Sequence, residues 1–191
     1  MPSLKEHYVT TIAPKLREAF ALPNVMAVPR IMKVVVNVGM GQAIREPKIA
    51  ELVLASLTRM TGQRPVRTLA RKSIATFKLR EGQAIGTMVT LRGKRMWDFL
   101  EKLIRATLPR VRDFRGIPQS AVDRQGNLSI GFREHMVFPE IRMDDVDQMH
   151  GVQVTVVTNA GTRERGVALF QALGVPFRSD SPQSQGERKR T

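Results

Sequence analysis

Alternating apolar and polar residues predict the strands of this chain. In residues 31–38, IMKVVVNV, every even position is apolar, so a strand there would place Lys33, Val35 and Asn37 on the face opposite the core. Four further segments have strand character, through the same period of two or through their β-branched residues. The predicted strands are residues 31–38, 66–70, 84–91, 128–132 and 152–158.

Apolar residues spaced three and four positions apart predict the helices. Pro14 lies inside the first of these patterns and is expected to kink or split it, and Pro109 is expected to end the third. Gly174 follows the last pattern in the position of a C′ residue. The predicted helices are residues 3–20, 47–61, 94–108 and 162–173. Because helices and strands are mixed without a steady βαβα order, we predict an α+β fold whose sheet carries its helices on one side.

The other face of this sheet is predicted to be open and polar. Its members are amides, hydroxyls and cations with little aromatic material: Lys33, Asn37, Thr90, Arg92, Ser129, Gly131, Gln153 and Thr155. Single-strand RNA binders stack bases on Phe or Tyr in their strands, so this composition does not match them. It suits hydrogen bonds to the ribose hydroxyls, phosphates and base edges of structured RNA. A sheet face that is merely solvated has a similar composition, so the face alone leaves both interpretations open.

Positive charge is concentrated between residues 64 and 95, where nine cations accompany a single acid, Glu81. The middle of this stretch, residues 73–82, is predicted to be a loop between two strands. The whole chain has 31 Lys and Arg against 17 Asp and Glu, a formal net charge of +14. Such an excess is self-repulsive in a folded protein, and the repulsion is offset when a polyanion binds, most commonly a nucleic acid.

Other partners are less consistent with the sequence. No run of about 18 apolar residues exists and no basic amphipathic helix stands alone at a terminus, so no membrane contact is expected. Residues 1–20 lack the apolar region of a signal peptide, and cysteine is absent, which together indicate a cytoplasmic protein. No helix-turn-helix or zinc-finger pattern indicates a DNA-binding protein.

Motifs for catalysis are weak. Gly39 and Gly41 follow a predicted strand, as in a dinucleotide-binding fingerprint, but Ile44 stands where the third glycine should be. The remaining candidate ligands are histidines in unrelated elements and neighbouring carboxylates: His7, His135, His150, Asp144, Asp145 and Asp147. None has the spacing of a metal site. We therefore expect neither an enzyme, nor a cofactor, nor a bound metal.

The composition changes after Phe177. Residues 179–191 are small and polar and end in Arg188-Lys189-Arg190-Thr191, which predicts a disordered basic tail. No internal repeat and no linker divides the rest, so residues 1–178 are predicted to form a single domain.

Several long segments resemble the bacterial large-subunit ribosomal protein five family, which binds 5S ribosomal RNA. The longest is ARKSIATFKLREGQAIGTMVTLRGKRMWDFLEKLI, residues 70–104. The resemblance runs in family order and covers nearly everything up to Arg178. The matching segments are residues 28–43, 61–65, 70–104, 108–117, 126–141 and 174–178.

This resemblance implies an antiparallel sheet that meets 5S rRNA, within the central protuberance of the large ribosomal subunit. The family's RNA-contacting positions match Asn37, Gln63 and Thr90, and the open face adds Lys33 and Arg92 to the predicted rRNA-binding set. Contacts with 23S rRNA and with other proteins of the central protuberance are implied as well.

Two further contacts are implied by the resemblance. The loop of residues 73–82 would reach the P-site tRNA through Ser73, Thr76, Lys78 and Arg80. The regions 110–116 and 133–151 would face the small-subunit head and form a bridge with a protein there. The predicted bridge residues are Arg110, Arg112, Arg115 and Arg133.

The chain departs from the family at three places. Residues 122–128, VDRQGNL, replace the usual FDGRGNY, and residues 162–165, TRER, replace an acidic helix start. The tail after Arg178 is an addition. A competing hypothesis is that the chain binds RNA outside the ribosome, as a free-standing RNA-binding regulator or RNA chaperone.

Overall fold

The computed structural model describes residues 3–41, 47–141 and 149–178. Its centre is a five-stranded sheet in the order β2-β3-β1-β5-β4, and every neighbouring pair is antiparallel. The strands are β1 (Ile31–Gly39), β2 (Val66–Leu69), β3 (Ala84–Leu91), β4 (Leu128–Phe132) and β5 (Val152–Thr158). All five strands predicted from the residue pattern are present, with bounds that differ by at most one residue.

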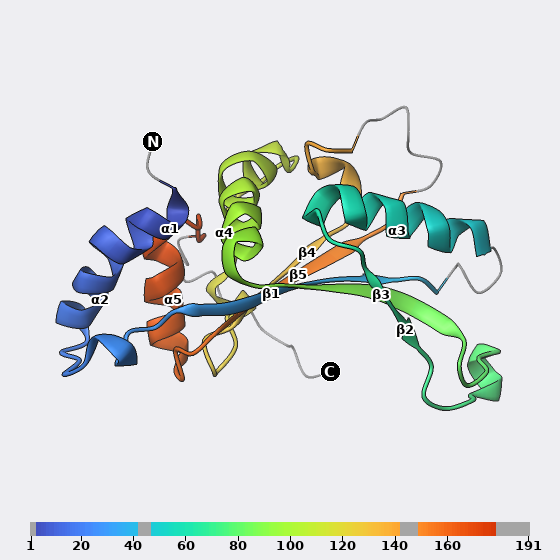
Figure 1. Ribbon diagram of the computed structural model, residues 1–191, viewed down its shortest axis with the longest axis horizontal. Helices are drawn as coiled ribbons and strands as arrows, with labels where there is room; N and C mark the ends of the chain where they lie inside the picture. Colours follow the sequence, from blue (N-terminus) through green and yellow to red (C-terminus); the bar gives the residue numbers. More distant parts are fainter. Residues whose placement is uncertain (1–2, 42–46, 142–148, 179–191) are drawn as a thin grey trace, which may run out of the picture.

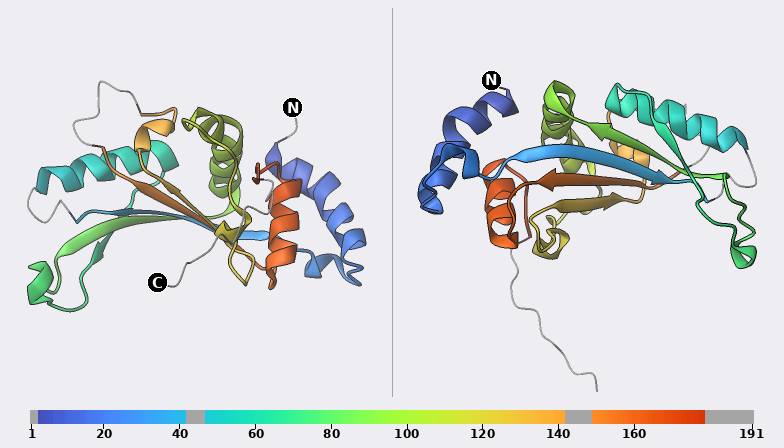
Figure 2. Two further views of the ribbon diagram at one scale, coloured as in Figure 1. Left: turned by 180° about the vertical axis from the view of Figure 1, so that it is seen from behind. Right: turned by 60° about the horizontal axis from the view of Figure 1, so that its bottom comes forward.

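The helices lie on one side of the sheet and at one of its ends. Helices α3 (Pro47–Thr61) and α4 (Gly93–Lys102) lie above the sheet in Figure 1, and the N-terminal helices gather with α5 (Arg163–Ala172) at one end. The right-hand view of Figure 2 looks onto strands β1, β5 and β4 with no helix in front of them. The predicted α+β class, with helices on one side of an antiparallel sheet, is therefore confirmed.

The core forms where the apolar face of the sheet meets the helices. Val34, Val36 and Val38 of β1 are at most 1% exposed, as the alternation predicted. Partners from the helices and loops are equally buried, among them Leu57, Met60, Leu103, Phe138, Leu169 and Phe170. Removing each such side chain from water contributes about 1.5–3 kcal/mol to folding, so burial fixes which side of β1, β3, β4 and β5 turns inward.

The prediction for Met32 was wrong. The alternation placed it in the core, but Met32 is 40% exposed and Ile31 is buried in its place. The pairing of β1 with β5 shifts between Ile31 and Lys33, which is the signature of a bulge. A bulge adds one residue to one strand, so the alternation shifts by one position there. Ile31 and Lys33, which would otherwise share a face, therefore lie on opposite sides of the sheet.

Two helices contain irregular turns that the residue pattern did not predict. The first runs as α1 (Leu4–His7), a π-helical turn (Tyr8–Ile12) and α2 (Ala13–Ala19). Pro14 lies at the start of α2, directly after the π-helical turn, so the regular α-helix is interrupted at the proline while the chain remains helical on both sides. Helix α4 ends at Lys102, before the predicted end, and the chain continues as a π-helical turn (Leu103–Thr107) and a 3₁₀ turn (Leu108–Arg110) that contains Pro109.

The altered turn at residues 122–128 is closed by its own side chains. Asp123 Oδ1 accepts hydrogen bonds from the backbone N–H groups of Gln125 (2.9 Å) and Asn127 (2.8 Å), and Asn127 Nδ2 donates to Oδ2 at 2.8 Å. Desolvation would raise the pKa of Asp123, but these hydrogen bonds outweigh it and lower the pKa below its ordinary value. The Asn127 side chain then accepts the N–H of Thr158 at 3.0 Å, which ties the turn to β5.

The same turn packs closely against helix α5. Gly126 has a φ of +85° and is buried beside Gly166 in the helix. A Cβ atom built on Gly166 would lie 2.5 Å from the Cα of Gly126 and 2.7 Å from its carbonyl oxygen. Both neighbours are backbone atoms and cannot rotate away, so glycine is required at this crossing.

We predict that Gly166→Ala destabilises the fold. Alanine is ordinarily favoured over glycine inside a helix by about 1 kcal/mol, so helix propensity alone predicts that the variant is more stable. The overlap with Gly126 should dominate and lower the free energy of unfolding by about 1–3 kcal/mol in urea denaturation. Gly131→Ala is the control, because no atom beyond Gly131 and its two chain neighbours lies within 4 Å of a Cβ placed there. A more stable Gly166→Ala variant would contradict this packing.

Candidate nucleic-acid interface

Residues of the open sheet face form two rows that cross the strands. Pairing partners in neighbouring strands share a face, so the register identifies the members of each row. The first row is Val66, Met88, Asn37, Gln153 and Gly131, and the second is Thr90, Val35, Thr155 and Ser129. The sequence pattern placed the polar members on one face, and the register confirms that placement.

The two rows differ in exposure. All five residues of the first row are exposed, whereas Thr90, Val35 and Thr155 in the second are half-buried. The hydroxyls of Ser129 and Thr155 lie 3.2 Å apart and form a hydrogen bond between β4 and β5. The face therefore presents hydrogen-bonding groups that a groove of structured RNA could contact, over a sheet that the core holds rigid.

Sequence reasoning missed the apolar part of this face. Val66 is 66% exposed and Met88 is 37% exposed, and the register pairs them at the β2 edge of the first row. The alternation in residues 84–91 had placed Met88 on this side. Only its apolar character kept it out of the polar set.

The cations Lys33 and Arg92 belong to the same side of the sheet. They flank the paired residues Val34 and Leu91, so the register places both at the same end of the neighbouring strands β1 and β3. Lys33 is half-buried and Arg92, which precedes α4, is exposed. Together they put positive charge at one end of the polar rows.

Gln63, in the turn after α3, contacts strand β3 of the sheet. Its Nε2 atom donates to the carbonyl oxygen of Thr90 at 3.3 Å. Thr90 and Asn37 lie on adjacent strands with one paired position between them. The structure thus brings together Asn37, Gln63 and Thr90, which the family resemblance had singled out from separate parts of the chain.

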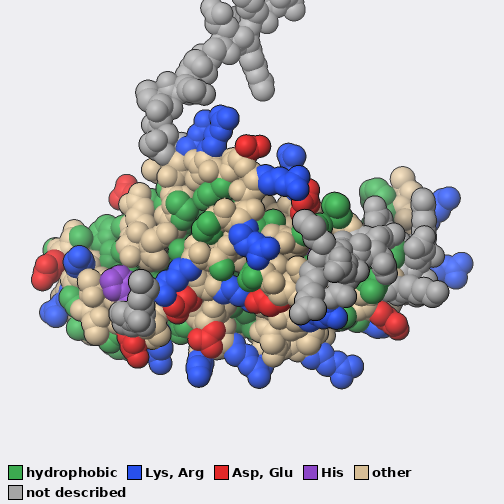
Figure 3. Space-filling view, turned by 90° about the horizontal axis from the view of Figure 1, so that it is seen from above, with side chains coloured by type: hydrophobic (Ala, Val, Ile, Leu, Met, Phe, Trp, Pro, Cys, Tyr) green, Lys and Arg blue, Asp and Glu red, His purple; other side chains and the backbone are tan. Residues whose placement is uncertain are grey.

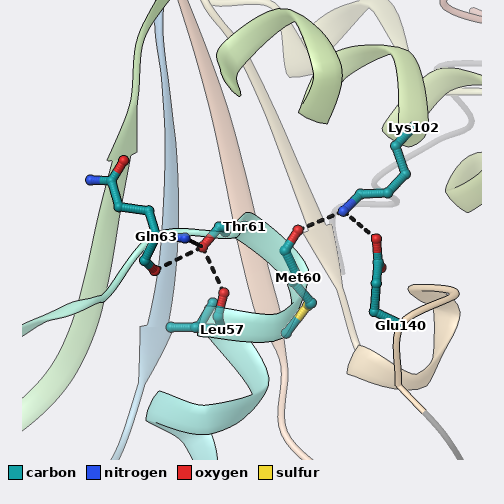
Figure 4. A network of polar contacts seen from close by, with 6 residues as sticks. All are labelled: Leu57, Met60, Thr61, Gln63, Lys102 and Glu140. Carbon is teal, nitrogen blue, oxygen red and sulfur yellow. Dashed lines mark hydrogen bonds and ion pairs between the residues drawn. The ribbon is translucent and has the colours of Figure 1, made fainter. Parts of the chain in front are cut away.

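A buried hydroxyl holds Gln63 in position (Figure 4). Thr61 Oγ1 lies 2.7 Å from the carbonyl oxygen of Leu57 and 3.1 Å from that of Gln63, and it accepts the N–H of Gln63 at 3.4 Å. Gly62 between them has a φ of +65°, which lets the chain reverse directly after the helix.

Lys102 fixes the end of α3 against α4. Its Nζ atom donates to the carbonyl oxygen of Met60 and to Oε1 of Glu140, each at 2.5 Å, and lies 5.3 Å from the centre of the Phe99 ring. A cation is favourable here because the last carbonyls of a helix carry partial negative charge. The turn that carries Gln63 is therefore supported from the helical side.

Residues 70–83 form a projecting loop, which we call the finger. It extends beyond the sheet at the end away from α5, below the level of α3 (Figure 1, Figure 2). Ala70 and Gln83 close its base, where the N–H of Ala70 donates to the carbonyl of Gln83 at 2.8 Å. Of the four residues predicted to contact tRNA, Thr76, Lys78 and Arg80 are exposed, and the exposed Ser73 accepts the N–H of Glu81 at 2.9 Å within the loop.

Three of the four predicted bridge residues surround one hollow. Arg110, Arg112 and Arg133 line a depression of about 520 Å³ beside the edge strand β4. Arg115 is exposed but is not among its lining residues. Residues 142–148, part of the second predicted bridge region, lie outside the described residues, as does the predicted tail at 179–191.

The helical side carries charges of both signs. Seen from that side, Asp and Glu are interspersed with Lys and Arg (Figure 3). An ion pair between Arg105 and Glu101, with the nitrogen and oxygen 2.5 Å apart, is one example on α4 and the turn that follows it. Mixed charge of this kind is usual for a solvated surface and gives no reason to place a polyanion there.

The histidines are not as separate as the sequence suggested. His135 and His150 stack with ring centres 3.8 Å apart, and the backbone N–H of His150 donates to Nδ1 of the His135 ring at 3.4 Å. Burial lowers the pKa of His135, and the stacked pair links the 3₁₀ turn His135–Val137 to the segment before β5.

In residues 3–41, 47–141 and 149–178, no group of three or more His, Cys, Asp or Glu side chains could hold a metal ion. None of the helices described there is long and apolar enough to cross a bilayer. The carboxylates Asp144, Asp145 and Asp147 fall outside these residues.

Comparison with known proteins gives a consistent match over the domain. A family model described as "Ribosomal protein L5" matches residues 24–80, and a second model, which describes the C-terminus of the same ribosomal family, matches residues 84–177. The chain is 51% identical over 177 residues to large ribosomal subunit protein uL5 of Halothermothrix orenii, which covers 93% of this chain and 99% of that protein. It is 52% identical to uL5 of a Roseiflexus species over 178 residues, and 52% identical to uL5 of a Synechocystis species over 176 residues. These alignments cover 93% and 92% of this chain and 99% and 98% of the relatives.

We predict that Thr61→Val destabilises the turn that carries Gln63. The change keeps the shape of a side chain that is 7% exposed but leaves the N–H of Gln63 without its acceptor, which should lower the free energy of unfolding by about 1 kcal/mol. Thr58→Val is the matched control, because Thr58 Oγ1 contacts the Leu54 carbonyl at 2.7 Å on the exposed side of the same helix. Urea denaturation measures both, and equal losses would contradict a special role for Thr61.

Proposed function

The chain belongs to the ribosomal protein L5 family and is a component of the large ribosomal subunit, and on that premise we propose that it binds 5S rRNA through the open sheet face. Proteins of this family are structural ribosomal proteins of the cytoplasm and not enzymes. The observation that supports the proposal is that Asn37 and Thr90 share that face and that Gln63 is hydrogen-bonded to the backbone of Thr90.

The chemistry of the face supports a structured RNA partner. Its rows offer amides and hydroxyls that can pair with ribose hydroxyls and base edges, and Lys33 and Arg92 can neutralise phosphates at one end. The first row contains no aromatic residue on which a single strand would stack. Val66 and Met88 add apolar contact area at the β2 edge, where they can cover the ribose surface of a groove.

We assign two further contacts to other parts of the molecule. The finger, with Lys78 and Arg80, contacts the P-site tRNA, because it projects far enough from the sheet to act apart from the 5S-binding face. The hollow lined by Arg110, Arg112 and Arg133 faces a protein of the small-subunit head and forms an intersubunit bridge.

The domain as a whole would help to attach 5S rRNA at the central protuberance. Residues 1–178 act as one domain, which also contacts 23S rRNA and neighbouring proteins there. A free-standing RNA-binding regulator is the weaker alternative, because the relatives that align over almost their full length are subunit proteins. Sedimentation separates the two, since a ribosomal protein co-migrates with the large subunit and a regulator remains mostly free.

We predict that single substitutions at the three convergent residues weaken 5S rRNA binding. Thr90→Val, Asn37→Ala and Gln63→Ala each remove a hydrogen-bonding group and leave an RNA group unpaired, which should cost about 1–3 kcal/mol of binding free energy. Filter binding at fixed salt measures the affinity, and Thr10→Val on the N-terminal helix is the control, since Thr10 is exposed away from the sheet. Unchanged affinity in all three variants would refute the assignment of the face.

We predict that the finger serves tRNA and contributes little to 5S binding. Lys78→Ala with Arg80→Ala should leave 5S affinity unchanged and increase the rate at which tRNA leaves the P site of assembled ribosomes. Lys94→Ala with Arg95→Ala removes the same charge from exposed positions on α4 and is the matched control. A collapse of 5S binding in the finger variant would show that the loop has been misassigned.

A further inference from the structure

Phe77 at the tip of the finger is exposed to solvent to an unusual degree. Its side chain is 72% exposed, more than any other large apolar side chain in the part of the chain that the structure describes. A phenylalanine is strongly stabilised by burial, and here the sheet and helices offer it no shelter. An aromatic ring held in water at the end of a projecting loop is fully available for contact with a partner.

The tip holds this ring in a defined place. Ile74 and Leu79 exchange two backbone hydrogen bonds, of 3.0 and 3.1 Å, and the 3₁₀ turn Ala75–Phe77 lies between them. Lys78, directly after the ring, has a φ of +53°, a left-handed conformation that few residues other than glycine adopt. A loop closed in this way can present a ring without the ordering cost of a flexible segment.

The surroundings of the ring favour a nucleic acid over a protein. Four cations of the finger are exposed, against the single acid Glu81: Arg71, Lys72, Lys78 and Arg80. Cations attract a phosphate backbone, and an aromatic ring among them offers a surface on which a base can stack. A protein partner would need several acids to match this charge.

We propose that Phe77 stacks on the exposed face of a base in the RNA that the finger contacts. The proposal rests on the proposed function, in which that RNA is the P-site tRNA. Every base has a π-face, so stacking is tolerant of sequence. That property suits a site that must accept tRNAs of different sequence, where hydrogen bonds to particular base edges would discriminate among them.

Substitutions at Phe77 test for stacking in assembled ribosomes. Phe77→Ala should speed tRNA dissociation from the P site by about 5- to 150-fold, the range expected for loss of one base–aromatic stack. Phe77→Tyr and Phe77→Trp should restore slow dissociation, while Phe77→Leu, which is apolar but lacks a π-system, should not. Full rescue by Leu, or no effect of Ala, would overturn the proposal.

The salt dependence of the same rates separates stacking from charge. Phe77→Ala should leave the slope of the logarithm of the rate against the logarithm of the salt concentration unchanged, because no phosphate contact is lost. The double substitution Lys78→Ala with Arg80→Ala should reduce this slope, because it removes two cations that can contact phosphates. The Phe77 variants should incorporate into large subunits as the wild type does, because the ring makes little contact with the fold.

Photo-crosslinking then identifies the partner independently of the tRNA assignment. Phe77→p-benzoylphenylalanine in full ribosomes should crosslink to tRNA, which supports both the stacking inference and the proposed function of the finger. A crosslink to ribosomal RNA alone would support stacking but contradict the tRNA contact. A crosslink to a ribosomal protein alone would overturn the stacking inference.

Discussion

The period of two in a β-strand is the constraint on which this molecule depends. One layer of helices can cover only one face of the sheet, so burial of Val34, Val36 and Val38 forces Lys33, Val35 and Asn37 to the other. A slip of one residue would turn Asn37 into the core and expose three valines. The stability of the core and the composition of the open face are therefore set by the same register.

Recognition is divided between two parts of the molecule with different chemistry. The open face offers hydrogen-bonding groups on rigid strands, and Gln63, which is bonded to the backbone of Thr90, is held by the buried Thr61. The finger offers charge and an exposed ring on a projecting loop. The first arrangement suits one structured RNA bound permanently, and the second suits partners that exchange.

Local pattern predicted the elements of this fold because strand and helix periods are visible in one segment at a time. Local pattern failed where contact with a second, distant segment of the chain determines the local structure. The bulge at Met32 depends on pairing with β5, and the contact of Gly126 with Gly166 joins a turn to a distant helix. Gln63 lies in a turn without a period, so only the family resemblance could single it out. The stack of His135 on His150 had no signal in the sequence.

Protection of the open face by 5S rRNA is the most direct test of this account. The chain has no cysteine, so single cysteines introduced as Ser129→Cys, Gln153→Cys and, on the helical side, Thr58→Cys can be alkylated without background. With RNA at about ten times its Kd, the free fraction falls to about a tenth, and alkylation at positions 129 and 153 should slow about tenfold. The rate at position 58 should not change. Equal rates with and without RNA at 129 and 153, or protection at 58 alone, would contradict the account.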